Sequence, residues 1–164
     1  MVIFPNAKIN IGLNIIGKRS DGFHDIETVF YPVQIKDALE IIPSENEIEP
    51  EIIFTSSGND INVNNEDNLC VKAFHLIKKD FPQILSVKMH LHKHIPVGAG
   101  MGGGSADASS VLLLLNKQFD LAISENKLME YALKLGSDCP FFIVNKPSFA
   151  AGRGERLQPI DIDL

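Results

Sequence analysis

The sequence has no tryptophan and only two cysteines, Cys70 and Cys139. Two cysteines cannot form the disulfide framework of a small secreted protein, so we expect a reducing, cytoplasmic location. No apolar run approaches the roughly 20 residues that a membrane-spanning helix needs, and the first residues lack the features of a signal peptide. The net charge of −6 argues against nucleic acid as a partner. What is left is a globular chain of ordinary composition, with 45% hydrophobic residues among 164.

Alternating apolar and polar residues mark the N-terminal half. Between Ala7 and Ile15 every second residue is apolar, which predicts a strand with one buried face and a polar face that carries Lys8 and Asn10. Asp21-Gly22 then predicts a tight turn. Further strands are expected over residues 23–34, 37–43, 52–55 and 86–95, with an acidic loop over residues 44–51.

Helical signals follow later in the chain. The asparagines between residues 64 and 68 can cap a helix that runs to about Asp80 and stops before Pro82. Two more helices are expected over residues 106–119 and 125–135, the second capped by Ser124 and ended by Gly136. Because strands dominate the first half and helices the second, the sequence predicts an α+β domain.

A glycine-rich stretch, residues 96–105, precedes the helix expected at 106. Glycine tolerates positive φ and lets a ligand approach the backbone closely. Free N–H groups in such a loop, together with the next helix N-terminus, bind anions. The stretch is therefore interpreted as a phosphate-binding loop; a flexible linker is the simpler alternative, but a linker is seldom followed at once by a helix.

Two common phosphate loops fit this stretch poorly. Gly98, Gly100 and Gly103 have the spacing of a dinucleotide-binding loop, but strands of that fold are apolar on both faces. The strand at 86–95 alternates instead, with Lys93 as the one charge on its otherwise apolar face. The acidic residue nearest the required distance, Asp120, lies between two helices. An ATPase-type loop would need a lysine where Gly104-Ser105 stands.

The string Pro-x-Gly-x-Gly-x-Gly-Gly-Gly-Ser at 96–105 resembles the phosphate loop of the GHMP kinases. Within that superfamily, the openings at 5–13 and 19–24 and the segments at 136–142 and 151–155 are similar to the 4-diphosphocytidyl-2-C-methyl-D-erythritol kinases. The resemblance spans nearly the whole chain. It implies an α+β GHMP kinase N-terminal domain over residues 1–164, with a ribosomal-protein-like fold and a left-handed β-α-β unit, an exception to the usual handedness.

The resemblance also implies an activity: transfer of the γ-phosphoryl group of ATP to a hydroxyl of 4-diphosphocytidyl-2-C-methyl-D-erythritol, in the non-mevalonate route to isoprenoids. Asp138 would accept the hydroxyl proton, and Lys8 would pair with it and stabilise negative charge. Asn10 would bind the acceptor, and Phe23 and His24 would contact the cytosine. Tyrosine is commoner than phenylalanine at position 23, so we expect the ring to stack on the base without the hydrogen bond that a phenol hydroxyl could add.

The remaining implied contacts involve the nucleotide, with ATP and Mg²⁺ as cofactors and neither a nucleic acid nor a membrane as partner. Ser105 would cap the helix beside the phosphates. The nucleotide-binding residues implied in this way are Pro96, Val97, Gly98, Ala99, Gly100, Met101, Gly102, Gly103, Gly104, Ser105, Ala106, Asn68 and Lys93.

Simpler interpretations compete with these roles. Without the resemblance, Lys8 is a solvated strand residue, Asp138 a turn residue and Phe23 a core residue. His90, His92 and His94 share a strand face, but they have no acidic or cysteine partner nearby in sequence, so no metal site is expected. Cys139 is interpreted as a small buried residue.

A dinucleotide-dependent oxidoreductase, another GHMP-type kinase and a non-catalytic nucleotide-binding module remain alternatives. Family members are longer and have a C-terminal lobe that completes the acceptor pocket. We therefore expect this chain to be the N-terminal piece of a kinase, with little or no turnover by itself, and we make no prediction of its oligomeric state.

Overall fold

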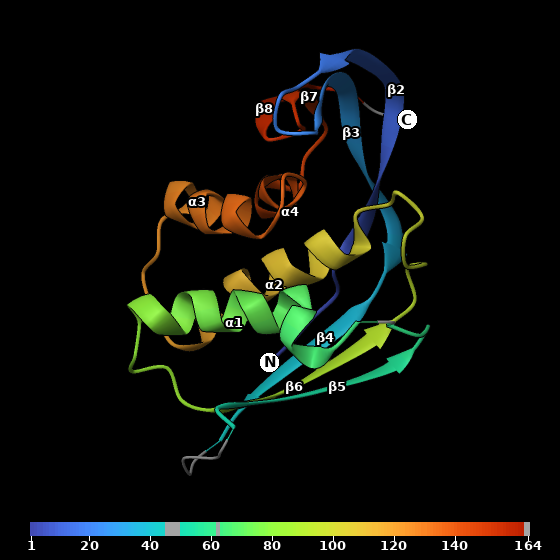
Figure 1. Ribbon diagram of the computed structural model, residues 1–164. Coiled ribbons are helices and arrows are strands. Elements are labelled where there is room, and N and C mark those ends of the chain that lie inside the picture. Colours follow the sequence, from blue (N-terminus) through green and yellow to red (C-terminus); the bar gives the residue numbers. More distant parts are fainter. Residues whose placement is uncertain (45–49, 62, 163–164) are drawn as a thin grey trace.

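A computed structural model describes residues 1–44, 50–61 and 63–162 (Figure 1). Strands prevail up to residue 58, and helices prevail between residues 69 and 144, so the predicted α+β class is confirmed. The strands are β1 (Val2–Ile3), β2 (Asn6–Lys18), β3 (His24–Lys36), β4 (Ala38–Pro43), β5 (Ile52–Gly58), β6 (Val87–Lys93), β7 (Ser148–Gly152) and β8 (Arg156–Pro159). The helices are the short 3₁₀ turn η1 (Asn65–Asp67), α1 (Leu69–Asp80), α2 (Gly103–Gln118), α3 (Glu125–Leu135) and α4 (Cys139–Val144).

Within the described residues, the strands form two four-stranded sheets. The first has the order β1-β4-β6-β5, in which β5 is parallel to β6 and the other pairs are antiparallel. This mixed pairing excludes the all-parallel sheet of a dinucleotide-binding domain. The second sheet has the order β2-β3-β7-β8 and is antiparallel throughout. α1 connects the parallel strands β5 and β6, so these three elements form a β-α-β unit. The resemblance implies that this unit is left-handed, and its handedness stays a prediction.

The main core lies between the first sheet and the helices α1 and α2, which run across it (Figure 1). On β6, Val87, Met89, Leu91 and Lys93 are buried, whereas Lys88 is exposed, as the alternation predicts. The sheet and helix side chains that meet in this core include Leu39, Ile41, Met89, Leu91, Phe74, Ile77 and Leu112.

The predicted helix boundaries agree closely with the structure. Asn68 caps α1 by accepting a hydrogen bond from the Cys70 N–H at 2.8 Å, and Ser124 caps α3 by accepting one from the Lys127 N–H at 3.3 Å. α2 begins three residues earlier than expected, at Gly103 instead of Ala106. The helix therefore starts inside the glycine-rich stretch, which places its first free N–H groups next to the loop.

The predicted burial of β2 is wrong for most of its length. Leu13 and Ile15, on the face expected to be buried, are 58% and 60% exposed, whereas Lys8, on the face expected to be polar, is buried. The β2–β3 hairpin extends beyond the helices (Figure 1), and bulges interrupt its register. Alternation indicates a strand, but whether a second layer covers its apolar face depends on the rest of the fold.

Most of the predicted acidic loop at 44–51, namely residues 45–49, lies outside the described residues. Among the helices that the structure describes, none has the length and apolar character to span a membrane.

Candidate active site

The glycine-rich stretch connects the end of β6 to the start of α2. Gly98, Gly100 and Gly102 all have left-handed backbones, with φ of 76°, 72° and 68°. The conformation of the loop therefore favours glycine at these alternate positions. The loop forms one wall of a cavity of about 360 Å³. Asn68, predicted to contact the nucleotide, also lines this cavity, together with Leu69 at the start of α1.

Lys8 connects β2 to this loop by a hydrogen bond. Its backbone N–H donates to the Met101 carbonyl at 2.9 Å. Lys8 as a whole is 4% exposed, and its ammonium lies 4.3 Å from the centroid of the Phe30 ring. The ammonium also donates to Asn10 Oδ1 at 2.5 Å. The backbone hydrogen bond to Met101, the Phe30 ring and the Asn10 side chain thus hold Lys8 in one orientation beside the loop.

The ammonium of Lys8 lies 3.5 Å from Asp138 Oδ2. These residues are 130 positions apart in the sequence, and only the resemblance to the kinase family predicted that they form a pair. Asp138 directly precedes α4, whose first residue is anchored to α2 by a hydrogen bond from Ser109 Oγ to the Cys139 carbonyl at 2.8 Å. The side chain of Asp138 is about one third exposed (32%), so a ligand can reach the carboxylate while the lysine stays buried.

The turn between β7 and β8 closes the site from a third side. A Cβ added to Gly154, whose φ is 109°, would lie 3.3 Å from Asp138 Oδ1 and 3.1 Å from the Phe30 ring. The positive φ and these two close contacts both favour glycine there. The sequence identifies this turn by resemblance, yet it carries no signal that Gly154 contacts Asp138. The structure therefore brings together four segments: the start of β2, the loop, the start of α4 and this turn.

The residues predicted to bind the acceptor divide into two places. Asn10 lies at the lysine, as described above. Phe23 is 52% exposed at the tip of the β2–β3 hairpin, where His24 begins β3. Arg153 stacks on the Phe23 ring at 4.9 Å, next to Gly154 in the same turn. The turn thus links the hairpin tip to Asp138, and Arg153 is a residue of this region that sequence reasoning missed.

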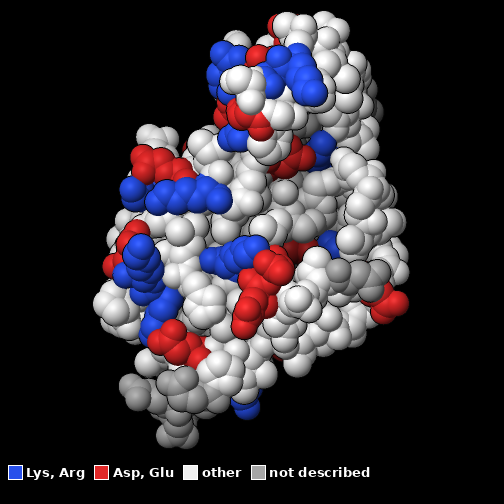
Figure 2. All heavy atoms as spheres, in the orientation of Figure 1, with Lys and Arg blue, Asp and Glu red and all other residues white. Residues whose placement is uncertain are grey.

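The hairpin tip is rich in charge. Arg19 forms ion pairs with Asp21 at 3.0 Å and with Asp25 at 2.9 Å. Figure 2 shows basic and acidic side chains gathered over this end of the molecule, near the hairpin tip and β8. A polar ligand that reaches Phe23 would therefore meet both signs of charge.

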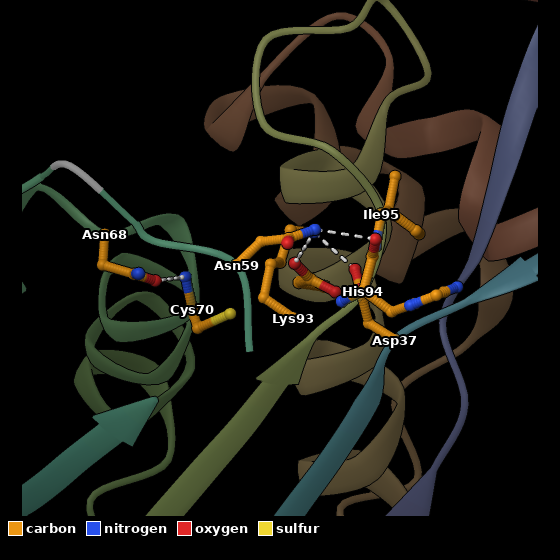
Figure 3. A network of polar contacts seen from close by, with 8 residues as sticks. Asp37, Asn59, Asn68, Cys70, Lys93, His94 and Ile95 are labelled. Carbon is orange, nitrogen blue, oxygen red and sulfur yellow. Dashed lines mark hydrogen bonds and ion pairs between the residues drawn. The ribbon is translucent and has the colours of Figure 1, made fainter. Parts of the chain in front are cut away.

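Lys93, predicted to contact the nucleotide, lies beneath the loop and lines the cavity. Its ammonium is bound by two buried carboxylates: that of Asp37, shown with Lys93 in Figure 3, and that of Asp107. Burial raises the pKa of Asp107 to about 7; Lys93 opposes that rise and Asp37 adds to it. The sequence places Lys93 correctly on the buried face of β6, but it gives no sign of either partner.

The histidines of β6 have other partners. His90 is hydrogen-bonded to Thr55 and Ser57, and His92 to Ser57, all across the β5–β6 pair. Within the described ranges, no three His, Cys, Asp or Glu side chains form a group that could hold a metal ion. Cys139 is fully buried, and burial raises the pKa of its thiol to about 11, so at neutral pH it is protonated and a poor nucleophile.

Comparison with known proteins gives a consistent result. Residues 68–146 match the family model of the GHMP kinases N terminal domain. The chain is 52% identical over 164 residues to the 4-diphosphocytidyl-2-C-methyl-D-erythritol kinase of Bacteroides fragilis, of which it covers 59%. It is 40% identical over 156 residues to the enzyme of that name from Methylacidiphilum infernorum, covering 95% of this chain and 53% of that protein.

Solved structures agree with these relatives. A crystal structure of 4-(cytidine 5'-diphospho)-2C-methyl-D-erythritol kinase superposes with a TM-score of 0.84 at 34% identity, covering 99% of this chain and 56% of that one. The mevalonate kinase of Methanococcus jannaschii, at 13% identity and a TM-score of 0.70 over 98% of this chain and 56% of its own, shares the fold. The chain thus spans somewhat more than half the length of the relatives that it matches.

Proposed function

The chain carries the N-terminal domain of the GHMP kinases, and on this premise we propose that it binds ATP and directs its γ-phosphoryl group to a hydroxyl of 4-diphosphocytidyl-2-C-methyl-D-erythritol. We place residues 1–164 in this one domain, within a longer kinase of the non-mevalonate route. The observation that carries the proposal is the ion pair of Lys8 and Asp138 at 3.5 Å beside the glycine loop. Unlike the carboxylates bound to Lys93, that of Asp138 is partly exposed, so it can accept a proton from a hydroxyl bound beside the loop.

The glycine loop is proposed to bind the ATP phosphates. Left-handed residues such as these glycines allow neighbouring backbone N–H groups of a loop to converge on an anion, and the free N–H groups at the start of α2 add a partial positive charge. Such a site needs no net positive charge, which agrees with the acidic composition of the chain. The cavity between loop and α1 is proposed to receive the base, with Asn68 at its edge.

Mg²⁺ is proposed to enter with the nucleotide. In phosphoryl-transfer sites this ion keeps several waters and takes ligands from the substrate phosphates, so it needs few protein ligands. That mode fits a site whose described residues form no three-membered group of metal ligands. When bound, the ion would neutralise phosphate charge.

Asp138 is proposed to act as the base and Lys8 as its electrostatic partner. The Asp138 carboxylate can accept the proton of the attacking hydroxyl. Since phosphoryl transfer depends mainly on positioning and charge stabilisation, a buried lysine with a fixed orientation is well suited to stabilise the negative charge that develops. Asn10 holds that orientation through its bond to the ammonium.

The acceptor is proposed to lie between Asp138 and the hairpin tip. Phe23 offers an exposed ring on which cytosine can stack, and His24 offers a neighbouring hydrogen-bonding group. The turn at 152–155 connects both ends of this path through Arg153 and Gly154. The part of the acceptor pocket that this chain lacks would be supplied by the C-terminal lobe.

The test is an Asp138→Asn variant of the full-length protein. ADP release with the cytidylylated acceptor should fall by at least about 100-fold, since general-base catalysis contributes this much, while ATP affinity measured by calorimetry stays within a few fold. Asp120→Asn, an exposed position in the α2–α3 loop, is the matched control and should keep full turnover.

Two outcomes contradict the proposal. Full turnover of Asp138→Asn would exclude the base assignment. Faster transfer to mevalonate or homoserine than to the cytidylylated acceptor would exclude the acceptor assignment and favour another GHMP-type kinase.

A further inference from the structure

Three charged side chains meet beneath the glycine loop, and each comes from a different element. Asp37 lies between β3 and β4, Lys93 is the last residue of β6, and Asp107 lies early in α2. The Lys93 ammonium donates to Asp37 Oδ2 (Figure 3) and to Asp107 Oδ2, the latter at 2.8 Å. Each of the three is at most 3% exposed. One buried lysine therefore joins the elements that surround the loop.

Asp37 holds the entrance of the loop. Its second oxygen, Oδ1, accepts hydrogen bonds from the backbone N–H groups of His94 at 2.5 Å and Ile95 at 2.7 Å (Figure 3). These two residues directly precede Pro96, where the loop begins. The same aspartate is itself anchored, because its backbone N–H donates to the Pro5 carbonyl at 2.9 Å. The carboxylate thus fixes the point at which the chain leaves β6.

The exit of the loop rests on the same lysine. A Cβ added to Gly103, the first residue of α2, would lie 2.8 Å from the Lys93 ammonium and 2.9 Å from the Ile95 side chain. The helix backbone therefore packs directly against Lys93, and Asp107 binds the same ammonium four residues later. Both ends of the loop are held within one cluster of charges.

The positive charge of Lys93 is already paired within the cluster. One ammonium faces two carboxylates, and Asp107 Oδ1 has no hydrogen-bond partner among the described residues. A lysine with two carboxylate neighbours contributes little attraction for a phosphate, since its field is already neutralised locally. This arrangement differs from a phosphate-binding lysine that points free into its pocket.

We propose that Asp37, Lys93 and Asp107 form a positioning cluster that sets the spacing between the two ends of the phosphate loop, with Lys93 acting through the loop backbone and not as a direct ligand. The inference rests on the proposed nucleotide site: the ligand whose binding it controls is the polyphosphate of a nucleotide, whereas the base binds elsewhere in the cavity. The cluster orders the loop before a nucleotide arrives.

Hydrogen exchange of the nucleotide-free protein tests this directly and independently of kinase activity. In Lys93→Met, amides of residues 94–106 should exchange about tenfold faster or more, the effect of an opening made easier by one charge-assisted interaction. Amides of α3 and β7 should be unchanged. Lys88→Met, an exposed lysine on the same strand, is the matched control. Unchanged exchange at 94–106 in a folded Lys93→Met protein would overturn the proposal.

Nucleotide binding separates positioning from direct contact. In Lys93→Met and in Asp37→Asn, affinity for MgATP should fall by a similar factor of about ten, while affinity for adenosine, which lacks phosphates, stays within twofold. The double variant should bind MgATP no more weakly than the worse single variant. If Asp37→Asn frees Lys93 and strengthens MgATP binding, Lys93 is a direct ligand and the proposal is wrong. A parent protein without MgATP affinity would contradict the proposed function instead, and hydrogen exchange would still decide the positioning role.

Asp107→Asn covers the case in which Lys93→Met does not fold. This variant keeps the Lys93–Asp37 pair and the loop entrance, and it removes only the charge at the helix. Exchange should therefore quicken at residues 103–107 and not at residues 94–96. Faster exchange at both ends, or at neither, would contradict the assignment of the loop entrance to Asp37 and the exit to Asp107.

Discussion

Lys8 and Lys93 approach the glycine loop from two different strands, and they are almost equally buried, at 4% and 3% exposed. Their partners differ. Lys8 faces one carboxylate that is about one third exposed and 3.5 Å away, whereas Lys93 is bound by two carboxylates that are themselves buried. The number and burial of the partners, more than the burial of the lysine, decide whether its charge is available to a ligand.

The comparison extends to two consecutive glycines. A Cβ on Gly102 would lie 3.2 Å from the Lys8 side chain and 2.8 Å from the Phe142 ring, and one on Gly103 would lie 2.8 Å from the Lys93 ammonium. Two consecutive residues thus pack against different lysines: Gly102 against Lys8, which is proposed to act in catalysis, and Gly103 against Lys93, which is proposed to position the loop. The loop ends where these two environments meet.

The largest expected effect comes from removing the available charge. Lys8→Met should lower phosphoryl transfer by at least about 100-fold, because a preorganised group that stabilises transition-state charge contributes on that scale. MgATP affinity should change far less. Rates of ADP release and calorimetry measure the two quantities, and Lys18→Met, exposed on the same strand, is the control. If transfer survives in Lys8→Met, the two lysines do not differ in the way proposed.

The glycine pair predicts a graded decrease in stability. Gly102→Ala combines a left-handed φ with contact against a ring, so the free energy of unfolding should fall by about 2–4 kcal/mol. Gly103→Ala should cost about 1–3 kcal/mol, because the held ammonium and Ile95 must move. Gly104 is the control: its added Cβ would have only an ordinary contact, 3.8 Å from Leu69.

Urea unfolding followed by circular dichroism measures all three variants. Gly104→Ala should be neutral or gain up to about 1 kcal/mol, because alanine favours the helix over glycine. Equal stabilities for the three variants would show that the contacts on the two sides of the loop do not constrain it.

The cluster around Lys93 should also show in the pH dependence of stability. The pKa of Asp107, about 7 in the folded protein, lies above its ordinary value of 3.8, so the folded state binds an extra proton between these values. The group's contribution to stability is therefore largest at acidic pH and is lost as the pH rises through about 7. The charged or titratable groups facing Asp107 are Lys93, Asp37 and Cys70.

Asp107→Asn removes this titration. Relative to the parent protein, the variant should gain about 1 kcal/mol of unfolding free energy per pH unit between pH 5 and 7. Urea titrations of both proteins at several pH values measure the difference. A constant difference across this range would show that Asp107 is ionised throughout, in which case the cluster carries a net negative charge.

The sequence predicts local features of both regions and few of their long-range contacts. Alternation locates β6 and places Lys93 on its buried face, and capping residues locate α1 and α3. The partner Asp37 is 56 positions from Lys93, and no local pattern connects the two. The pairing of Lys8 with Asp138 came from the resemblance alone, since in isolation each residue suits a solvated strand or a turn.

The failure on β2 has a physical cause of the same kind. Leu13 and Ile15 alternate as buried residues do, yet nothing in a single strand states whether another layer lies over it. Burial of Lys8 depends on Phe30 of β3 and Met101 of the loop, and the approach of Gly154 to Asp138 depends on how the β7–β8 turn folds back. Such contacts are set by packing between elements, which periodicity does not encode.

The smallest expected effect concerns the stability contributed by the Lys8–Asp138 pair. Asp138 is partly exposed, so water screens the interaction, and ion pairs of this kind contribute about 1 kcal/mol or less. In the Asp138→Asn variant, Lys8 should keep its hydrogen bond to Asn10 and its position over the Phe30 ring. Asp138→Asn should therefore change the free energy of unfolding by less than about 1 kcal/mol, measured by urea titration at pH 7, even though its transfer rate collapses. Asp37→Asn, whose carboxylate is buried against Lys93, should cost several times more. If the two variants were destabilised equally, the Lys8–Asp138 pair would be as structural as the Lys93 cluster, and exposure of the carboxylate would not distinguish a reactive pair from a supporting one.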